Sequence, residues 1–221
     1  MMAMVVKTML VTFKNKLSFR EVPLFRGALL NKAQGDNTLF HDHIGDKFRY
    51  SYPLVQYRTV DGYAAVFCLN EGINAVENIF GDTNQMEVRI GRRNEMLVVD
   101  HKVCQYDDIA VIASPKSYCI YNYLPLNQEN YSLYMETDSI VERYSIIEKC
   151  LTGNILSFAK SLGVFFERQI NLSLLDVIDK HELKYKNINM LGFSLKFKTD
   201  VLLPRYIALG KGVSLGFGII K

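Results

Sequence analysis

The spacing of apolar and polar residues in the first half of the chain predicts alternating strands and helices. A strand is expected at residues 5–14, followed by a helix within residues 20–33. Ser18 and Glu21 have capping-box spacing, but a helix starting there would contain a proline. We therefore expect Pro23 to take the first helical position.

The same pattern continues through the next sixty residues. Strands are expected at residues 48–60 and 62–70, with a hairpin turn at Asp61-Gly62. A short helix at 71–81 and strands at 86–90 and 96–106 follow. This order of strand, helix, strand, strand, helix and strand is that of the ferredoxin-like split βαβ unit.

The second half of the chain has a looser version of this order. Strands are expected at residues 108–114, 117–126 and 192–198, and a long helix at 139–163 that Gly163 ends. The helix carries apolar residues on one face, namely Ile140, Tyr144, Ile147, Leu151, Ile155, Phe158 and Leu162. The last of these strands alternates Phe193, Leu195 and Phe197 with Ser194, Lys196 and Lys198.

These patterns predict an α+β fold of tandem ferredoxin-like (βαββαβ) domains with antiparallel sheets. Residues 1–108 form the expected N-terminal domain, and residues 109–221 form a degenerate C-terminal domain with a glycine-rich loop. At 221 residues, of which 49% are hydrophobic, the chain has enough apolar material for the cores of two domains.

Charge is distributed unevenly along the chain. The net charge is +3, but residues 180–221 contain eight Lys and Arg against two Asp and Glu, a surplus of +6. This basic region favours an anionic partner, and solvated lysines on the polar face of a sheet are the alternative.

The cysteines and the N-terminal segment indicate a cytoplasmic protein without a membrane partner. The four cysteines form no C-x-x-C pair, which favours reduced thiols over disulfides or zinc. The apolar start contains Lys7 and resembles a first strand more than a signal peptide, and no apolar run has the length of a membrane span.

The C-terminal segment is dense in glycine. Nine residues contain Gly210, Gly212, Gly216 and Gly218, together with Lys211 and Ser214. The glycine spacing fits neither the Walker pattern nor the dinucleotide fingerprint, and too few residues follow for the helix that both require. Two interpretations remain: backbone N–H groups that bind a phosphate beside the lysine, or glycines that permit a tight crossing between strands.

A pair of histidines lies in the predicted loop after the first helix. His41 and His43 are two residues apart, and a histidine of near-neutral pKa transfers protons at physiological pH. Asp42 and Asp46 make metal binding an alternative, although no distant third ligand is indicated, and a structural role is another. His101 and His181 are expected to have no catalytic role.

Basic and aromatic residues follow the histidines. Lys47, Tyr50, Tyr52 and Arg58 interleave charge with aromatic rings, as do Arg49 and Tyr57. Such interleaving on a sheet is typical of RNA-binding modules, and it also suits a packed core.

Together these segments resemble a known family. "FRGALL", "FHDH", "YSYPLVQY", "EG" after the hairpin and "LPRYIALGKGVSLGFG" at the end are similar to the CRISPR-associated repeat-processing endoribonucleases of the RAMP superfamily. Within this family the chain resembles the branch with a His-x-His pair in the N-terminal domain. The matching segments cover less than a third of the chain.

The resemblance implies metal-independent cleavage of CRISPR repeat RNA in precursor transcripts, which yields guide RNAs. The 2′-hydroxyl attacks the scissile phosphate and gives a 2′,3′-cyclic phosphate and a 5′-hydroxyl. His41 and His43 are the implied acid and base, and no cofactor or metal is expected. The implied RNA-binding residues are Lys47, Tyr50, Tyr52, Arg58, Gly210, Lys211, Gly212, Ser214 and Gly216.

Precursor RNA is the implied partner, with a CRISPR effector complex and a homodimer left open as further assemblies. The family often has Asn between the two histidines, where this chain has Asp42. A non-catalytic RNA-binding subunit of an effector complex is the alternative function, since such subunits share the fold. An unrelated ferredoxin-like protein that binds a small anion is a third.

Overall fold

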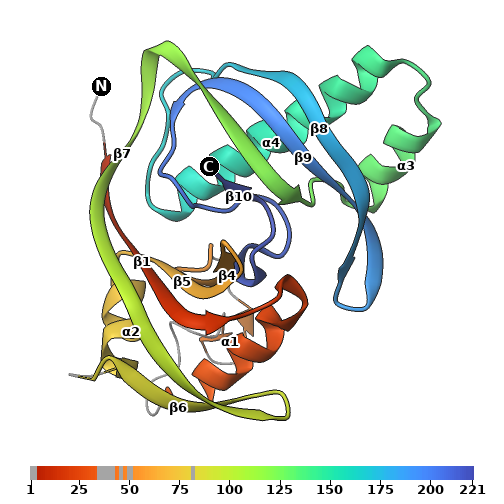
Figure 1. Ribbon diagram of the computed structural model, residues 1–221. Coiled ribbons are helices and arrows are strands. Elements are labelled where there is room, and N and C mark those ends of the chain that lie inside the picture. The colour runs from red at the N-terminus through yellow and green to blue at the C-terminus, as the bar shows by residue number, and fades with distance from the viewer. Residues whose placement is uncertain (1–3, 34–42, 45–46, 49–51, 81–82) are drawn as a thin grey trace. The chain divides into compact units, whose positions relative to one another are not determined.

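The computed structural model describes residues 4–33, 43–44, 47–48, 52–80 and 83–221. They form two compact units (Figure 1). The N-terminal unit contains Val5–Asp107 and also Ser214–Gly216, and the C-terminal unit contains Asp108–Val213 and Phe217–Lys221 together with Met4 at the start of the chain. The predicted domains are continuous stretches, whereas the N-terminal unit includes three residues from near the end of the chain.

The N-terminal unit has the strand order of a ferredoxin-like fold. Its elements are β1 (Met4–Lys16), η1 (Phe19–Glu21), α1 (Val22–Leu30), β2 (His43–Ile44), β3 (Lys47–Phe48), β4 (Val55–Val60), β5 (Tyr63–Leu69), α2 (Glu71–Phe80), β6 (Gln85–Ile90) and the first part of β7 (Arg93–Tyr123). The sheet order is β4–β5–β1–β7, with β6 paired to β7. The pairs β1–β5, β4–β5 and β6–β7 are antiparallel.

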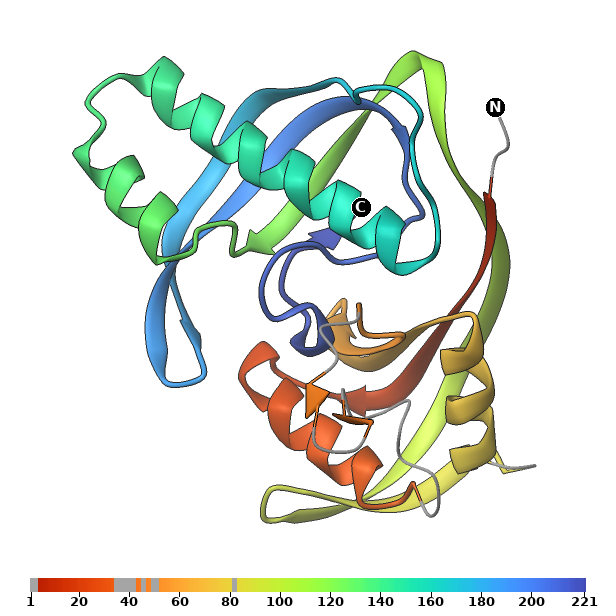
Figure 2. The same cartoon turned by 180° about the vertical axis from the view of Figure 1, so that it is seen from behind.

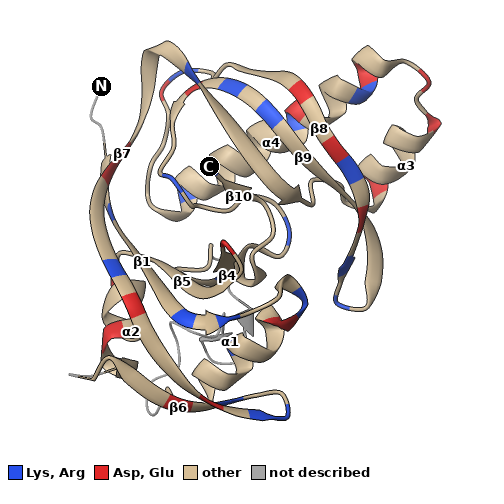
Figure 3. Cartoon of the chain, in the orientation of Figure 1, with Lys and Arg blue, Asp and Glu red and all other residues tan. Residues whose placement is uncertain are grey.

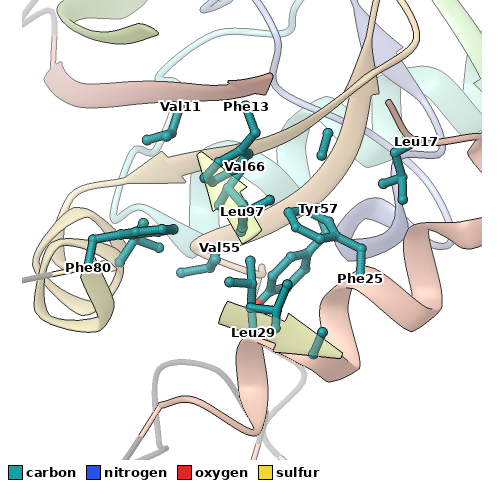
Figure 4. Close-up of a cluster of buried hydrophobic side chains, with 14 of the residues drawn as sticks. Val11, Phe13, Leu17, Phe25, Leu29, Val55, Tyr57, Val66, Phe80 and Leu97 are labelled. Atoms are coloured by element: carbon teal, nitrogen blue, oxygen red, sulfur yellow. The ribbon is translucent and has the colours of Figure 1, made fainter. Parts of the chain in front are cut away.

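One hydrophobic core connects the two helices of this unit to its sheet (Figure 4). The alternation of β1 places Met9, Val11 and Phe13 in this core. The ring of Phe13 meets Phe25 of α1 edge-on at 5.8 Å and Phe80 of α2 at 5.5 Å. The apolar pattern found in the sequence is therefore the one that forms the core.

The first helix begins with both features seen in the sequence, the capping-box pair Ser18 and Glu21 and the proline Pro23. The backbone N–H and the hydroxyl of Ser18 both donate to the carboxylate of Glu21, at 3.0 and 2.7 Å, and a 3-10 turn begins there. The α-helix proper begins at Val22, with Pro23 in its first turn. The 3-10 turn allows a capping box and a helix-starting proline to follow one another.

The predicted hairpin at Asp61-Gly62 is confirmed. Val60 pairs with Tyr63, and the two residues between them have φ angles of 51° and 83°. Positive φ at both central positions is the requirement of a type I′ turn, which explains the Asp-Gly pair.

The C-terminal unit repeats the ferredoxin-like order with one change. It contains the second part of β7, α3 (Gln128–Glu136), α4 (Ile140–Ser161), β8 (Leu172–Tyr185), β9 (Ile188–Leu202) and β10 (Ile219–Ile220). The sheet order is β7–β9–β8, with β10 antiparallel to β7, and α4 lies over one face (Figure 2). The glycine-rich segment lies where the second helix of a complete unit would come. The predicted α+β tandem ferredoxin-like fold is confirmed.

Helix α4 and strand β9 match their predicted patterns closely. Leu151, Ile155 and Phe158 are buried, and Gly163 has a φ of 78° just after the helix. Ile140 differs from the prediction, because it lies in the first turn and is 66% exposed. In β9 the predicted apolar residues are buried and the alternating lysines are exposed.

Three features of the structure in this region differ from the sequence predictions. The strands predicted at 96–106, 108–114 and 117–126 belong to one 31-residue strand, β7. Pro115, which separates two of them in the sequence, falls inside the register shift between Val111 and Lys116. Helix α3 was not predicted, and neither was strand β8, which contains His181.

Candidate functional site

Of the two predicted catalytic histidines, the described residues include His43. His41 is outside them, as are Asp42, Asp46, Arg49 and Tyr50. His43 is the first residue of β2, which pairs with β3 through His43–Phe48 and Ile44–Lys47. The backbone of His43 and of Lys47 is therefore fixed in a two-stranded ribbon.

Two residues of β4 that were considered for RNA binding are buried in the structure. Tyr57 faces the core, 2% exposed, with its ring edge-on to Phe25 at 6.0 Å, and burial raises the pKa of its hydroxyl. Arg58 is fully buried on the other face, where its guanidinium donates to the Gln56 side chain and lies 4.9 Å from the centre of the Phe67 ring. Burial with these partners gives Arg58 a packing role in the structure, and its predicted contact with RNA stays a prediction. Tyr52 remains half-buried ahead of β4.

The first two glycines of the C-terminal segment are required by close packing. Gly210 and Gly212 have φ angles of 86° and 74°. A Cβ on Gly210 would lie 2.7 Å from the ring of Tyr123, and one on Gly212 would lie 2.7 Å from the ring of Phe217. Any larger residue would collide at both positions, in addition to the strain of a positive φ.

Lys211 is anchored between these glycines. Its backbone N–H donates to the carbonyl of Leu124 at 3.2 Å, and its ammonium donates to the carbonyl of Leu126 at 2.8 Å. Burial lowers the pKa of this half-buried ammonium. Because an ammonium has three N–H groups, this bond leaves two donors for an anion.

Ser214–Gly216 belong to the N-terminal unit, where Leu215 packs against the hydrophobic core. Gly216 has a φ of 82°, and a Cβ there would lie 3.3 Å from the Cβ of Arg58 and from the carbonyl oxygen of Tyr57. Ser214 is half-buried within the 3-10 turn Val213–Leu215. These contacts support the interpretation that the glycines permit a tight crossing between strands. Phosphate binding by this segment remains a prediction.

The other two histidines lie beside acidic neighbours. Nδ1 of His101 is 2.7 Å from Oδ2 of Asp100, and Nδ1 of His181 is 2.8 Å from Oδ2 of Asp179. Within the described part of the chain, no three His, Cys, Asp or Glu side chains gather as metal ligands. Nor does any helix in that part have the length and apolar content to cross a membrane.

One aromatic residue near the glycine-rich segment was missed in the sequence. Tyr185, at the end of β8, packs its ring edge-on against Phe217 at 5.6 Å and also touches Gly212. No local pattern marks this residue, because its partners lie about thirty positions away in the chain and only the fold brings them together.

Two ferredoxin-like units, with a glycine-rich segment packed among aromatic rings, define the chain as a tandem ferredoxin-like protein of the RAMP kind. The family model of the Cas6b N-terminal domain matches residues 4–106, and that of the Cas6b C-terminal domain matches residues 110–221. The chain therefore belongs to the Cas6b family, which confirms the family resemblance found in the sequence.

Two solved structures agree with this assignment. A crystal structure of Cas6b is 25% identical, with a TM-score of 0.85 over 98% of this chain and 99% of that chain. The crystal structure of a CRISPR RNA processing endoribonuclease Cas6b is also 25% identical, with a TM-score of 0.75 over 98% of both chains. An uncharacterized protein of Methanocaldococcus jannaschii is 36% identical over 98 residues, which cover 44% of this chain and only 65% of that relative.

Proposed function

We propose that this protein is a metal-independent endoribonuclease that cleaves CRISPR repeat RNA in precursor transcripts to produce guide RNAs. The observation that carries the proposal is membership of the Cas6b family in both halves of the chain, combined with the histidine pair His41 and His43. A similar Cas6b structure is described as a CRISPR RNA processing endoribonuclease.

The proposed reaction uses a nucleophile that the RNA itself supplies. The ribose 2′-oxygen forms a bond to the adjacent phosphorus, and the bond from phosphorus to the 5′-oxygen of the next nucleotide breaks. One histidine accepts the proton of the 2′-hydroxyl, and the other protonates the leaving 5′-oxygen. The products are a 2′,3′-cyclic phosphate and a 5′-hydroxyl, so no water molecule has to be activated by a metal.

Asp42, which lies between the two histidines in the sequence, is expected to change the pH optimum of the cleavage reaction. A carboxylate beside an imidazole favours the protonated ring and raises its pKa. We therefore expect the pH optimum to lie higher than for a His-Asn-His arrangement, and Asp42→Asn to shift it downward.

Binding of the RNA backbone is assigned to the basic C-terminal region. Lys211 holds two free donors at a fixed position, and residues 180–221 carry a surplus of +6. Ser214 adds a hydroxyl, and in the N-terminal unit Lys47 and Tyr52 remain candidate contacts. We expect Lys211→Ala to lower affinity for many RNAs alike, because a phosphate contact carries no base specificity. Unchanged affinity would leave the lysine with its packing role alone.

The decisive experiment is cleavage of the repeat RNA from the array of the same genome, under single-turnover conditions. His41→Ala and His43→Ala should each slow cleavage by about two orders of magnitude or more, the usual contribution of a general acid or base. Binding should be largely retained. His101→Ala is the matched control, since that histidine is exposed and pairs with Asp100, and its rate should equal that of the unaltered protein.

Two further measurements test the chemistry. EDTA should leave the rate unchanged, and the upstream product should end in a cyclic phosphate. A repeat RNA with a 2′-deoxy nucleotide before the cut should bind, resist cleavage and compete with the substrate. A double variant of His41 and His43 that still cuts at the same position would refute the assignment. Binding without cleavage by the unaltered protein would favour the non-catalytic RNA-binding subunit.

A further inference from the structure

Residues 127–142, which include α3 and the start of α4, form a helix-pair tip with apolar side chains on its surface. Three residues connect the two helices, so the end of α3 lies beside the start of α4 (Figure 2). Five large apolar side chains of the tip are between 44% and 76% exposed, namely Tyr131, Leu133, Met135, Ile140 and Val141. Single exposed apolar residues are ordinary on a protein surface, whereas an exposed group of them marks an interaction site.

The fold holds the helix-pair tip in place without using these apolar side chains. The buried residue of α3 is Tyr134, whose ring meets that of Phe193 edge-on at 5.7 Å. The guanidinium of Arg143 lies over the same ring at 5.3 Å, and its Nε donates to the carbonyl of Thr137 at 2.6 Å. The tip is therefore anchored from its inner side, and its outer side is left for another molecule.

The charged residues of the tip are all acidic. They are exposed and comprise Glu129, Glu136, Asp138 and Glu142, and Figure 3 shows the red of Asp and Glu on α3 and on the loop after it. No ion pair among the described residues includes any of the four carboxylates.

Only two of these acids have a role in the helices themselves. Glu129 and Glu142 lie in first turns, where a negative charge suits the helix dipole. Glu136 ends α3, where a negative charge opposes the dipole, and Asp138 lies in the connection. The stability of the helices therefore gives no reason for Glu136 and Asp138.

The combination of apolar and acidic side chains selects a class of partner. Carboxylates repel RNA phosphates, so RNA is disfavoured at the tip. Two copies of the tip facing each other would bring like charges together, which disfavours a symmetric dimer. A protein surface with apolar side chains among Lys and Arg fits both features, because apolar contacts supply affinity and complementary charges supply specificity.

We propose that the helix-pair tip is a docking site for a partner protein that presents apolar side chains flanked by lysines and arginines. Leu133 and Val141 supply apolar contacts, and Glu136 and Asp138 attract the basic residues of the partner. The site is separate from the residues assigned to RNA cleavage, so the inference goes beyond the proposed function and does not depend on it.

A model partner tests the tip directly. The probe is a fluorescent helical peptide of about 15 residues, with leucine on one face and lysine elsewhere, which carries the proposed chemistry in its simplest form. Its binding to the full-length protein should saturate and should weaken as salt is raised, because the attracting charges are exposed. A peptide with glutamate in place of every lysine has the same apolar face and should not bind.

The apolar part of the site is tested by a matched pair of double variants. Leu133→Ser with Val141→Ser should weaken binding of the lysine peptide by about tenfold or more, the scale expected for central interface contacts. Leu156→Ser with Phe165→Ser is the control, because both side chains are exposed and Leu156 lies about 22 Å farther along α4. Binding by the control should equal that of the unaltered protein.

The acidic part is tested in the same way. Glu136→Gln with Asp138→Asn should weaken binding at low salt and make it less sensitive to salt, because two attracting charges are lost. Glu167→Gln with Asp176→Asn removes the same charge from exposed positions outside the tip and should leave both properties unchanged. Thermal melting establishes that each variant is folded.

The outcomes separate this inference from its alternatives. If the folded tip variants bind the lysine peptide like their controls, or if the glutamate peptide binds equally well, the proposed docking site is wrong. If the tip variants alter the salt dependence of repeat RNA binding, the tip contacts RNA instead. A dimer in sedimentation that Leu133→Ser with Val141→Ser abolishes would make the occupant a second copy. Failure of the unaltered protein to cleave repeat RNA would refute the proposed function alone.

Discussion

Arg58 illustrates how the surroundings of a charged residue in the sequence can differ from its surroundings in the fold. It follows three tyrosines and other basic residues, which suggests an exposed RNA-binding strand. In the fold it is fully buried, with its guanidinium bonded to Gln56 and held over the Phe67 ring. The arginine therefore contributes to the interior of the N-terminal unit, where a cation requires polar and aromatic partners.

Arg58→Ala should destabilise the protein by about 2–4 kcal/mol, because it leaves a cavity and removes the partner of the buried Gln56 amide. Arg92→Ala, at an exposed position, should change stability by less than about 0.5 kcal/mol. Urea unfolding measures both. If the folded Arg58→Ala protein instead shows normal stability and a reduced salt slope for RNA binding, the packing role is wrong.

Gly216 allows a second comparison between residues of one type. Gly216→Ala should destabilise by about 1–3 kcal/mol, because φ is +82° and the added methyl group would press on Arg58. Gly153 lies in α4 with open space around it, and Gly153→Ala should stabilise by up to about 1 kcal/mol. Equal effects of the two substitutions on unfolding would contradict the contact described for Gly216.

At the scale of elements, the 3-10 turn that precedes α1 lowers the pKa of one of its residues, Glu21. The Ser18 hydroxyl, the Ser18 backbone N–H and the charge of Arg93 hold the pKa of Glu21 below its ordinary value of 4.5. A lowered pKa means that the carboxylate stabilises the fold above the unfolded-state pKa. That contribution disappears as the pH falls through the folded-state value.

Ser18→Ala removes the largest of these causes, so the pKa of Glu21 should rise toward 4.5. It should remain lower than in an unfolded peptide, since Arg93 is still in place. NMR titration of the Glu21 carboxyl carbon measures the change. A pKa that does not move would show that the hydroxyl makes no bond to the carboxylate in solution.

The elements that the sequence predicted well are those with strong local signals. The turn at Asp61-Gly62 needs positive φ, and the apolar face of α4 repeats over six turns, so neither depends on distant contacts. Helix α3 was missed because only Tyr134 is buried and no apolar stripe exists. Strand β7 was divided at Pro115, because proline usually ends a strand, yet here it lies within an irregular stretch that continues the strand.

The candidate site was predictable only in part, because only some of its residues belong to local sequence motifs. The histidine pair and the glycine cluster stand out as local motifs. Tyr123, Leu126 and Tyr185, which hold the glycine-rich segment, lie far from it in the chain and carry no motif. The burial of Arg58 likewise depends on residues that only the folded sheet brings to it.

At the scale of the whole molecule, charge is concentrated toward the end of the chain. The surplus of +6 in residues 180–221 includes exposed lysines of β9 and of the turn between β8 and β9 (Figure 3). Basic side chains release counterions when they bind phosphates, so affinity depends on salt in proportion to the contacts made.

RNA binding should therefore weaken steeply as salt is raised. With at least three phosphate contacts, log affinity should fall against log salt with a slope of about −2 or steeper. Fluorescence anisotropy with labelled repeat RNA and with a scrambled RNA measures the slope for both. A slope near zero would exclude the basic region as the binding surface.

Ser214–Gly216 are built into the N-terminal unit, although the ribosome adds them about a hundred residues after Asp107. Domains generally fold from the N-terminus onward as they are synthesised. Here the nascent N-terminal unit must wait for a distant segment before its contacts with Leu215 and Gly216 can form. Until then the part of the core against which Leu215 packs lacks this cover on the growing chain, so assistance from chaperones is most useful during that interval.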